Sequence, residues 1–107
     1  MFSKTSHLPH VISYSLTESL FKNFGDKTFD FSGGSLEDYT RIASSDPLMW
    51  KDIMISNHQN VLDSIEDFEE SLTHLKGLIK KKDEKALVDY FNRVKILRDN
   101  SVKSDEL

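Results

Sequence analysis

The feature that most constrains the fold is a run of apolar residues at the spacing of a helical seam. Between His58 and Lys81 these residues follow one another at steps of four, three, four, three and four positions. They are Val61, Ile65, Phe68, Leu72, Leu75 and Ile79. The pattern is sustained for almost three heptads and predicts a single helix about 36 Å long. A stripe of this length favours packing against another helix.

Start signals divide the remaining sequence into four further helices. Leu8–Phe24 has apolar residues at helical spacing, with a proline tolerated in the first turn. Residues 25–34 hold three of the four glycines and form the one predicted loop. Ser35–Asp38 has the form of a capping box and is expected to begin a short helix. Asp46 followed by Pro47 predicts the N-cap and the first residue of the next helix.

The C-terminal part of the sequence predicts a last amphipathic helix followed by a polar tail. We expect Asn57 to cap the seam helix and Asp83 to cap the last one. From Asn100 the composition turns polar, so residues 1–100 are assigned to one domain and 101–107 to a polar tail or linker. The apolar face expected to be buried on the last helix consists of Ala86, Leu87, Tyr90, Phe91, Val94 and Leu97.

The predicted class is therefore all-α, with about five helices that include one long heptad-patterned helix. The seam and the last helix leave more apolar surface than five helices can hide within one chain. We therefore expect a helical homodimer with the seam or its neighbours at the interface.

Composition excludes several classes of function. The chain has no cysteine, which excludes a disulfide framework, a thiolate metal site and a cysteine nucleophile. It carries 14 basic and 18 acidic residues, and acidic residues exceed basic ones in both halves, so no nucleic-acid partner is expected. No apolar run approaches the roughly 20 residues of a membrane span, and the N-terminus has no signal-peptide pattern. We expect a cytoplasmic protein with no membrane partner.

Two imidazoles and one guanidinium are the candidate binding groups. His7 and His10 lie one turn apart, but no third ligand is near in sequence, so hydrogen bonding to a ligand is favoured over a metal site. Arg41 follows a Gly-Gly-Ser helix start, where a guanidinium and unpaired backbone N–H groups could converge on a carboxylate. From spacing alone, an ion pair of Arg41 with Glu37 or Asp38 is equally open.

Two strings resemble the C-terminal domain of prephenate dehydrogenases. Residues 6–10 are Ser-His-Leu-Pro-His, and residues 33–53 are Gly-Gly-Ser-Leu-Glu-Asp-Tyr-Thr-Arg-Ile-Ala-Ser-Ser-Asp-Pro-Leu-Met-Trp-Lys-Asp-Ile. The resemblance extends to about Arg98. It implies an enzyme of tyrosine biosynthesis that oxidatively decarboxylates prephenate to 4-hydroxyphenylpyruvate with NAD. Arogenate in place of prephenate, and NADP in place of NAD, stay open.

The resemblance implies substrate-binding roles but no catalytic residue in this chain. In the family, the catalytic histidine and the cofactor site belong to a preceding Rossmann domain, which is absent here, so the chain alone is expected to be inactive. Arg41 would hold a substrate carboxylate. Trp50 of the same subunit or of the other subunit would form one wall of the site. The remaining implied contacts are His10 and His7 in the pocket, Asp38 orienting the charged cluster, and Gly34 offering its backbone.

Two alternatives accompany this interpretation. The chain could be a stand-alone helical interaction module, or an aromatic-acid-sensing domain that binds without catalysis. The presence of Arg41, His10 and Gly34 together counts against the first, because a pure dimer module does not need them. Ser35 and Leu36 stand where family members often have a glycine and a phenylalanine, which changes the expected shape of the pocket.

Overall fold

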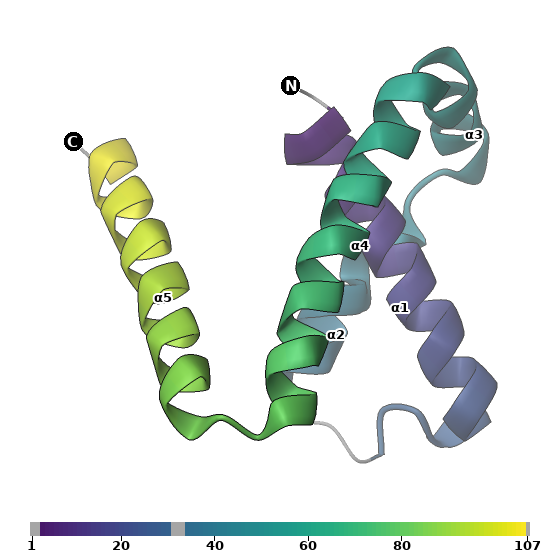
Figure 1. Cartoon of the computed structure of the whole chain (residues 1–107). Helices are drawn as coiled ribbons and strands as arrows, with labels where there is room; N and C mark the ends of the chain where they lie inside the picture. Colours follow the sequence, from purple (N-terminus) through teal and green to yellow (C-terminus); the bar gives the residue numbers. More distant parts are fainter. Residues whose placement is uncertain (1–2, 31–33, 107) are drawn as a thin grey trace. The chain divides into compact units, whose positions relative to one another are not determined.

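The computed structural model describes residues 3–30 and 34–106, with the side chains of 5–30 and 36–102. Every regular element in these residues is helical, which confirms the all-α prediction (Figure 1). None of these helices is long and apolar enough to cross a membrane. The elements are η1 (Ser3–His7), α1 (Leu8–Phe24), η2 (Gly25–Lys27), α2 (Gly34–Thr40), η3 (Arg41–Ser44), α3 (Pro47–Ser56), α4 (His58–Lys81) and α5 (Glu84–Glu106).

The first of two compact units, Met1–Asp67, is organised around α1. This helix packs against η1, η2, α2 and η3 (Figure 1). The hydroxyl of Ser13, which is buried, donates a hydrogen bond of 3.0 Å to the carbonyl of Tyr39. One residue on, the hydroxyl of Tyr14 lies 3.5 Å from the carbonyl of Ser45. These two bonds fix α2 and η3 on one side of α1.

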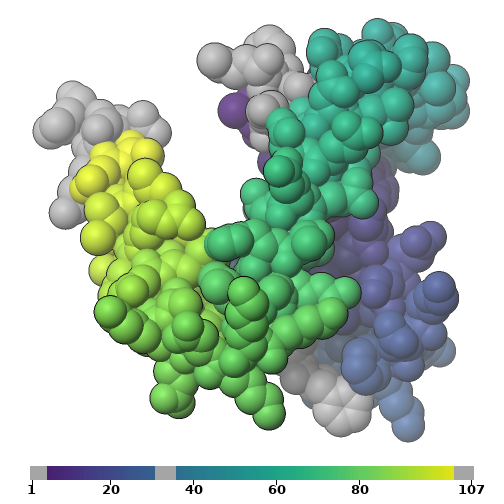
Figure 2. Space-filling view, viewed as in Figure 1, coloured from purple at the N-terminus to yellow at the C-terminus, as the bar shows by residue number. Residues whose placement is uncertain are grey.

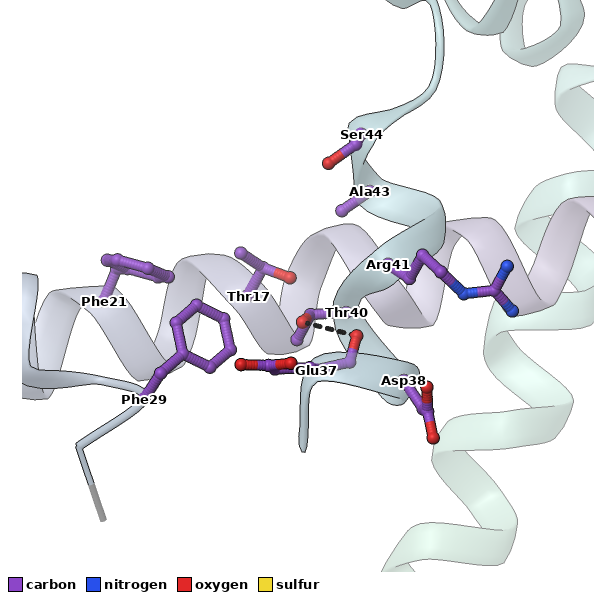
Figure 3. A pocket seen from close by; sticks show the side chains of 9 residues that line it. All are labelled: Thr17, Phe21, Phe29, Glu37, Asp38, Thr40, Arg41, Ala43 and Ser44. Atoms are coloured by element: carbon purple, nitrogen blue, oxygen red, sulfur yellow. Dashed lines mark hydrogen bonds between the residues drawn. The ribbon is translucent and has the colours of Figure 1, made fainter. Parts of the chain in front are cut away.

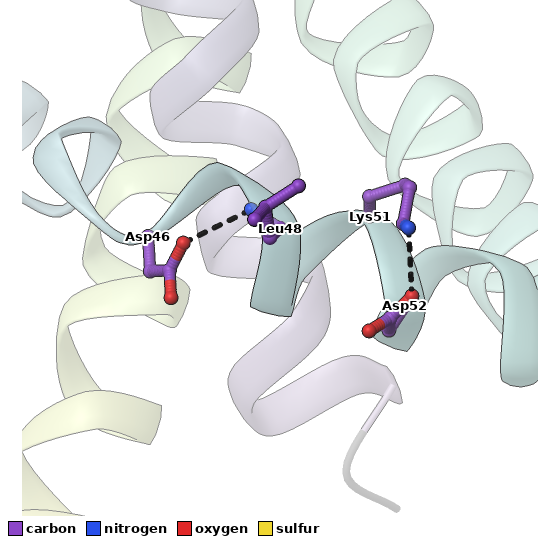
Figure 4. Close-up of polar contacts among 4 residues, drawn as sticks. All are labelled: Asp46, Leu48, Lys51 and Asp52. Carbon is purple, nitrogen blue, oxygen red and sulfur yellow. Dashed lines mark hydrogen bonds and ion pairs between the residues drawn. The ribbon is translucent and has the colours of Figure 1, made fainter.

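The ends of α1 and α3 follow from local chemistry. Gly25 ends α1 at φ +56°, a conformation that glycine adopts without a steric penalty, and its N–H donates to the carbonyl of Phe21. Asp46 is the N-cap of α3, as predicted, because its carboxylate accepts a hydrogen bond of 3.0 Å from the backbone N–H of Leu48 (Figure 4). Pro47 is the first residue of that helix.

Two capping predictions turn out differently. The α2 helix begins at Gly34, so Ser35 lies inside its first turn, and the side chain of Ser35 lies outside the described residues. Asn57 precedes α4, as expected, but its side-chain oxygen accepts from the Asn60 amide at 2.7 Å. Its backbone carbonyl accepts from the N–H of Val61. Asn57 therefore begins α4 by its position and binds a side chain rather than a backbone N–H.

The second unit, Phe68–Leu107, contains the remainder of α4 and all of α5. Asp83 caps α5 as predicted, since its carboxylate accepts from the N–H of Ala86 at 3.1 Å. The rings of His74 and Tyr90 bring the two helices into contact, with centroids 5.8 Å apart. The α5 helix runs to Glu106, beyond the end near Asn100 that its polar composition predicted.

Few apolar side chains are buried. Among the described residues, the buried hydrophobic side chains are Trp50, 7% exposed, and Val61, 4% exposed. Half of the α5 face that was expected to be buried is exposed, whereas Ala86, Leu87 and Tyr90 are partly buried. Parts of the α4 seam are exposed as well. Figure 2 gives a space-filling view of the chain, with α4 in green and the end of α5 in yellow. The exposed fractions of Leu72, Ile79, Phe91, Val94 and Leu97 range from 42% to 58%. The prediction of a buried face was therefore wrong for Phe91, Val94 and Leu97, which are exposed in the part of the chain that the structure describes.

Candidate functional site

Three aromatic rings and one amide side chain meet near the start of α1. We call this group the His–Trp cluster, and it consists of His7, His10, Trp50 and Asn57. The ring of His10 stacks on the indole of Trp50, with centroids 3.6 Å apart and planes inclined by 22°. His7 meets the same indole edge-on at 5.9 Å. The predicted pair of imidazoles is therefore brought together with the predicted tryptophan, within one chain.

Hydrogen bonds in the His–Trp cluster indicate how each imidazole is held. Nδ1 of His10 lies 3.0 Å from the carbonyl of Ser6, and because a carbonyl only accepts, Nδ1 carries the proton in this contact. Nε2 of a neutral His10 is then an acceptor. Nδ1 of His7 lies 3.4 Å from the amide nitrogen of Asn57, which donates, so Nε2 of a neutral His7 carries the proton. The two rings offer one acceptor and one donor.

The indole N–H of Trp50 is buried, and no hydrogen-bond partner for it is found among the described residues. Two cavities of about 330 and 380 Å³ border the His–Trp cluster. The first is lined in part by Tyr14 and Lys51, and the second in part by Asp52 and Met49. The cluster thus has polar groups and open space around a tightly packed ring pair.

Arg41 lies at a second place in the same unit, in a cavity of about 500 Å³ that we call the Arg41 pocket (Figure 3). Its apolar part is formed by the rings of Phe21 and Phe29, which meet at 71° with centroids 5.7 Å apart. The residues that line the pocket are Thr17, Phe21, Phe29, Glu37, Asp38, Thr40, Arg41, Ala43 and Ser44.

The charged side chains of the Arg41 pocket do not neutralise one another. Within the described part of the chain, Arg41 forms no ion pair with Glu37 or Asp38. Figure 3 shows the Glu37 carboxylate beside the ring of Phe29 and the Arg41 guanidinium extending in the opposite direction. The hydroxyl of Thr40 is already used, since it donates to the carbonyls of Leu36 and Glu37. The guanidinium is therefore available to bind a carboxylate in a bidentate manner, through two parallel N–H···O hydrogen bonds.

The residues predicted to form one site lie in two places. Asp38 and Arg41 line the Arg41 pocket, whereas His7, His10 and Trp50 form the His–Trp cluster. From His10 to Thr17 is about 10 Å along the axis of α1 at 1.5 Å per residue. Gly34 is the first residue of α2.

Sequence reasoning missed Phe21, Phe29 and Glu37 as lining residues of the Arg41 pocket. Glu37 was considered only as an ion-pair partner for Arg41, and the two phenylalanines come from separate segments, α1 and the turn after η2. A signal for Phe29 was available, because it is a large apolar residue within an otherwise polar, glycine-rich loop. In the described residues no group of three or more histidines and carboxylates is placed to hold a metal ion.

Residues 1–93 match the family described as prephenate dehydrogenase, dimerization domain. The chain belongs to this family. It is 32% identical over 99 residues to prephenate dehydrogenase of Bacillus subtilis, covering 91% of this chain and 27% of that protein. It is 37% identical over 90 residues to cyclohexadienyl dehydrogenase of Zymomonas mobilis, covering 81% of this chain and 31% of that protein.

The fold of this dimerization domain is also found in a solved enzyme. A crystal structure of prephenate dehydrogenase from Aquifex aeolicus, in complex with hydroxyphenyl propionate and NAD+, superposes with a TM-score of 0.83 at 45% identity. The superposition covers 91% of this chain and 35% of that one. The chain therefore spans about a third of the length of these relatives.

Proposed function

We propose that this chain is the dimerisation and substrate-binding part of a cytoplasmic, NAD-dependent prephenate dehydrogenase. The enzyme would transfer a hydride from prephenate to NAD+, with loss of CO2 and aromatisation of the ring to give 4-hydroxyphenylpyruvate. The described residues contain no strand followed by a glycine-rich turn, so they do not fit a dinucleotide site. NAD would be bound by residues outside this sequence, and the chain alone would be inactive.

The proposal is carried by the Arg41 guanidinium, which forms no ion pair among the described residues and lies in a pocket with an aromatic wall, in a chain of this family. Prephenate carries two carboxylates, and a guanidinium can bind one of them through two charge-assisted hydrogen bonds. Asp38, which lines the same pocket, would orient the guanidinium, and Gly34 would bring the backbone of α2 close to the ligand.

The His–Trp cluster would supply the remaining contacts. His10 offers an acceptor, His7 offers a donor, and the Trp50 indole offers an N–H that has no acceptor among the residues that the structure describes. Because the cluster and the Arg41 pocket lie apart along α1, we propose that two copies of the chain associate and that the complete site is assembled in the dimer. The exposed apolar residues of α4 and α5 support this association.

The first test is the size of the native polypeptide, measured by immunoblot of source-cell lysate with antiserum against this chain. A band longer by on the order of 150 residues or more is expected, enough for a nucleotide-binding domain. A band at the size of this chain, with no partner that supplies a cofactor site, would contradict the dehydrogenase assignment.

The second test is Arg41→Ala in the native enzyme. Losing a charge-assisted bond costs about 1.5–3 kcal/mol, so KM for prephenate should rise about tenfold to a hundredfold, with a smaller change in kcat. Lys22→Ala is the control, because it removes an exposed cation from the same unit outside the pocket. An unchanged KM in Arg41→Ala would remove Arg41 from the site.

A further inference from the structure

One flank of α4 carries negative charge in its first half and positive charge in its second half. Beside the apolar seam runs a stripe of residues that contains Glu66, Glu69, Lys76 and Lys80, and we call it the charged flank. At about 100° per residue these four positions lie within roughly 80° of one another around the helix, so they share one flank. All four side chains are exposed.

The charged flank is not neutralised within the chain. Among the described residues, none of its four side chains forms an ion pair. Glu66 and Glu69 are three positions apart and Lys76 and Lys80 are four apart, so neighbouring side chains carry like charges, which destabilises an isolated helix. The helix dipole accounts for Lys80 in the last turn, but the first turn of α4 contains no acidic residue. The pattern therefore points to a partner with a complementary sequence of charges.

The seam beside the charged flank is open in the same stretch of α4. Leu72 and Ile79 are 54% and 55% exposed, whereas Phe68 and Leu75 are partly buried. In coiled coils, an apolar stripe supplies the contact area, and the charges along its edge decide which helix binds and in which direction. The partner that fits α4 is another helix with an apolar stripe and a charged edge.

A second copy of α4 that runs in the opposite direction meets both requirements. In a parallel pair, the acidic half of each helix would lie beside the acidic half of the other, and like charges at short range repel. In an antiparallel pair, a twofold axis perpendicular to the helices brings the same flank of both copies together, acidic half to basic half. With Leu72 opposite Leu75 of the second copy, Glu69 lies within about 3 Å of the level of Lys76 of the second copy along the helix axis.

We propose that the charged flank selects a second copy of this chain as the partner of α4 in antiparallel orientation, with Glu69 of each copy paired with Lys76 of the other. The proposal rests on the dimer of the proposed function. It adds the direction of the two helices, their register and the residues that exclude a parallel pair.

Reversal of charge tests the pairing. Glu69→Lys and Lys76→Glu each turn two attractions across the twofold axis into repulsions, so each single variant should raise the dissociation constant of the dimer about fivefold or more. The double variant restores both pairs with their signs exchanged, and its dissociation constant should return to within about twofold of the wild-type value. Sedimentation velocity of the native protein over a dilution series measures these constants, at low ionic strength where screening is weakest.

Glu70→Lys is the control, because it makes the same change at an exposed position about 180° around α4 from Ile79 of the seam. It should leave the dissociation constant nearly unchanged, and circular dichroism checks that every variant is helical. A double variant that dimerises no better than the weaker single variant, or single variants that behave like Glu70→Lys, would overturn the antiparallel pairing.

The wild-type protein separates this failure from failure of the proposed dimer. If the wild type dimerises and the double variant is not restored, the dimer stands and only the direction and register of α4 fail. If the wild type sediments as a monomer at every concentration, the dimer of the proposed function fails and the pairing of α4 fails with it.

Discussion

Trp50 combines tight packing with an unused polar group. Its ring is buried under His10, yet its indole N–H has no acceptor among the described residues. Leaving a buried donor unsatisfied costs about 1–3 kcal/mol, whereas the ring itself contributes through its area and its stacking. The two contributions can therefore be separated by substitution.

We expect Trp50→Phe to be tolerated far better than Trp50→Ala. Phenylalanine keeps an aromatic ring against His10 and removes the unpaired N–H, so the free energy of unfolding should fall by about 1 kcal/mol or less. Alanine leaves a cavity and should cost about 3–5 kcal/mol. Urea titrations at one fixed protein concentration measure both values, and equal losses would show that the N–H has an acceptor in the native protein.

At the residue scale, spacing left the pairing of Arg41 open between a ligand and an ion pair with Glu37 or Asp38. Arg41 and Asp38 line one pocket, and the ion pair is not formed among the described residues. The reason lies in the backbone: α2 ends at Thr40, and Arg41 begins a 3-10 turn. A 3-10 turn has three residues per turn instead of 3.6, so the rule of side chains four apart no longer holds across this junction. Spacing alone does not reveal such a change of helix type.

At the scale of an element, the helix starts that depend on one local hydrogen bond were predicted from the sequence. Asp46 and Asp83 cap the helices that their positions indicated. The end of α5 was not predicted, because residues 100–106 are mostly polar but contain neither glycine nor proline. The helix continues there with support from an ion pair of 3.4 Å between Lys95 and Asp99. Polarity alone does not end a helix when no residue breaks it.

The cap of α3 gives a prediction at this scale. Asp46→Ala removes the acceptor of the Leu48 N–H and should lower the free energy of unfolding by about 1 kcal/mol. Asp46→Asn keeps an oxygen acceptor and should cost only a few tenths of that. Asp52→Ala is the control, because this aspartate is exposed on the same helix and, among the described residues, forms its ion pair with Lys51 (Figure 4). Chemical denaturation measures all three variants, and equal losses for Asp46→Ala and Asp52→Ala would contradict the capping role.

At the scale of the molecule, the helical class and the long seam followed from periodicity, but the division of the site did not. Periodicity indicates which residues share a face and not which faces meet, and it was the family resemblance that implied one site for His10 and Arg41. The structure places them in separate groups along α1. Burial within the chain was overestimated because periodicity does not show whether an apolar face packs within the chain or against a second copy. Phe91 and Val94, which are exposed here, lie on such a face.

The proposed dimer makes stability depend on concentration. A chain whose apolar side chains are largely open gains its stability from association, so its melting temperature should rise as the protomer concentration increases.

Phe91 and Ile96 give a matched pair of variants on α5: both are more than half exposed, but their positions differ by about 140° around the helix. Only Phe91 lies on the apolar face with Val94 and Leu97. We expect Phe91→Glu to raise the dissociation constant at least about tenfold, because it places a charge in the interface, and Ile96→Glu to leave it nearly unchanged. Sedimentation velocity over a dilution series measures the dissociation constants of the two variants. Equal effects of the two substitutions would place the interface elsewhere. A wild-type chain that sediments as a monomer at every concentration would contradict the dimer.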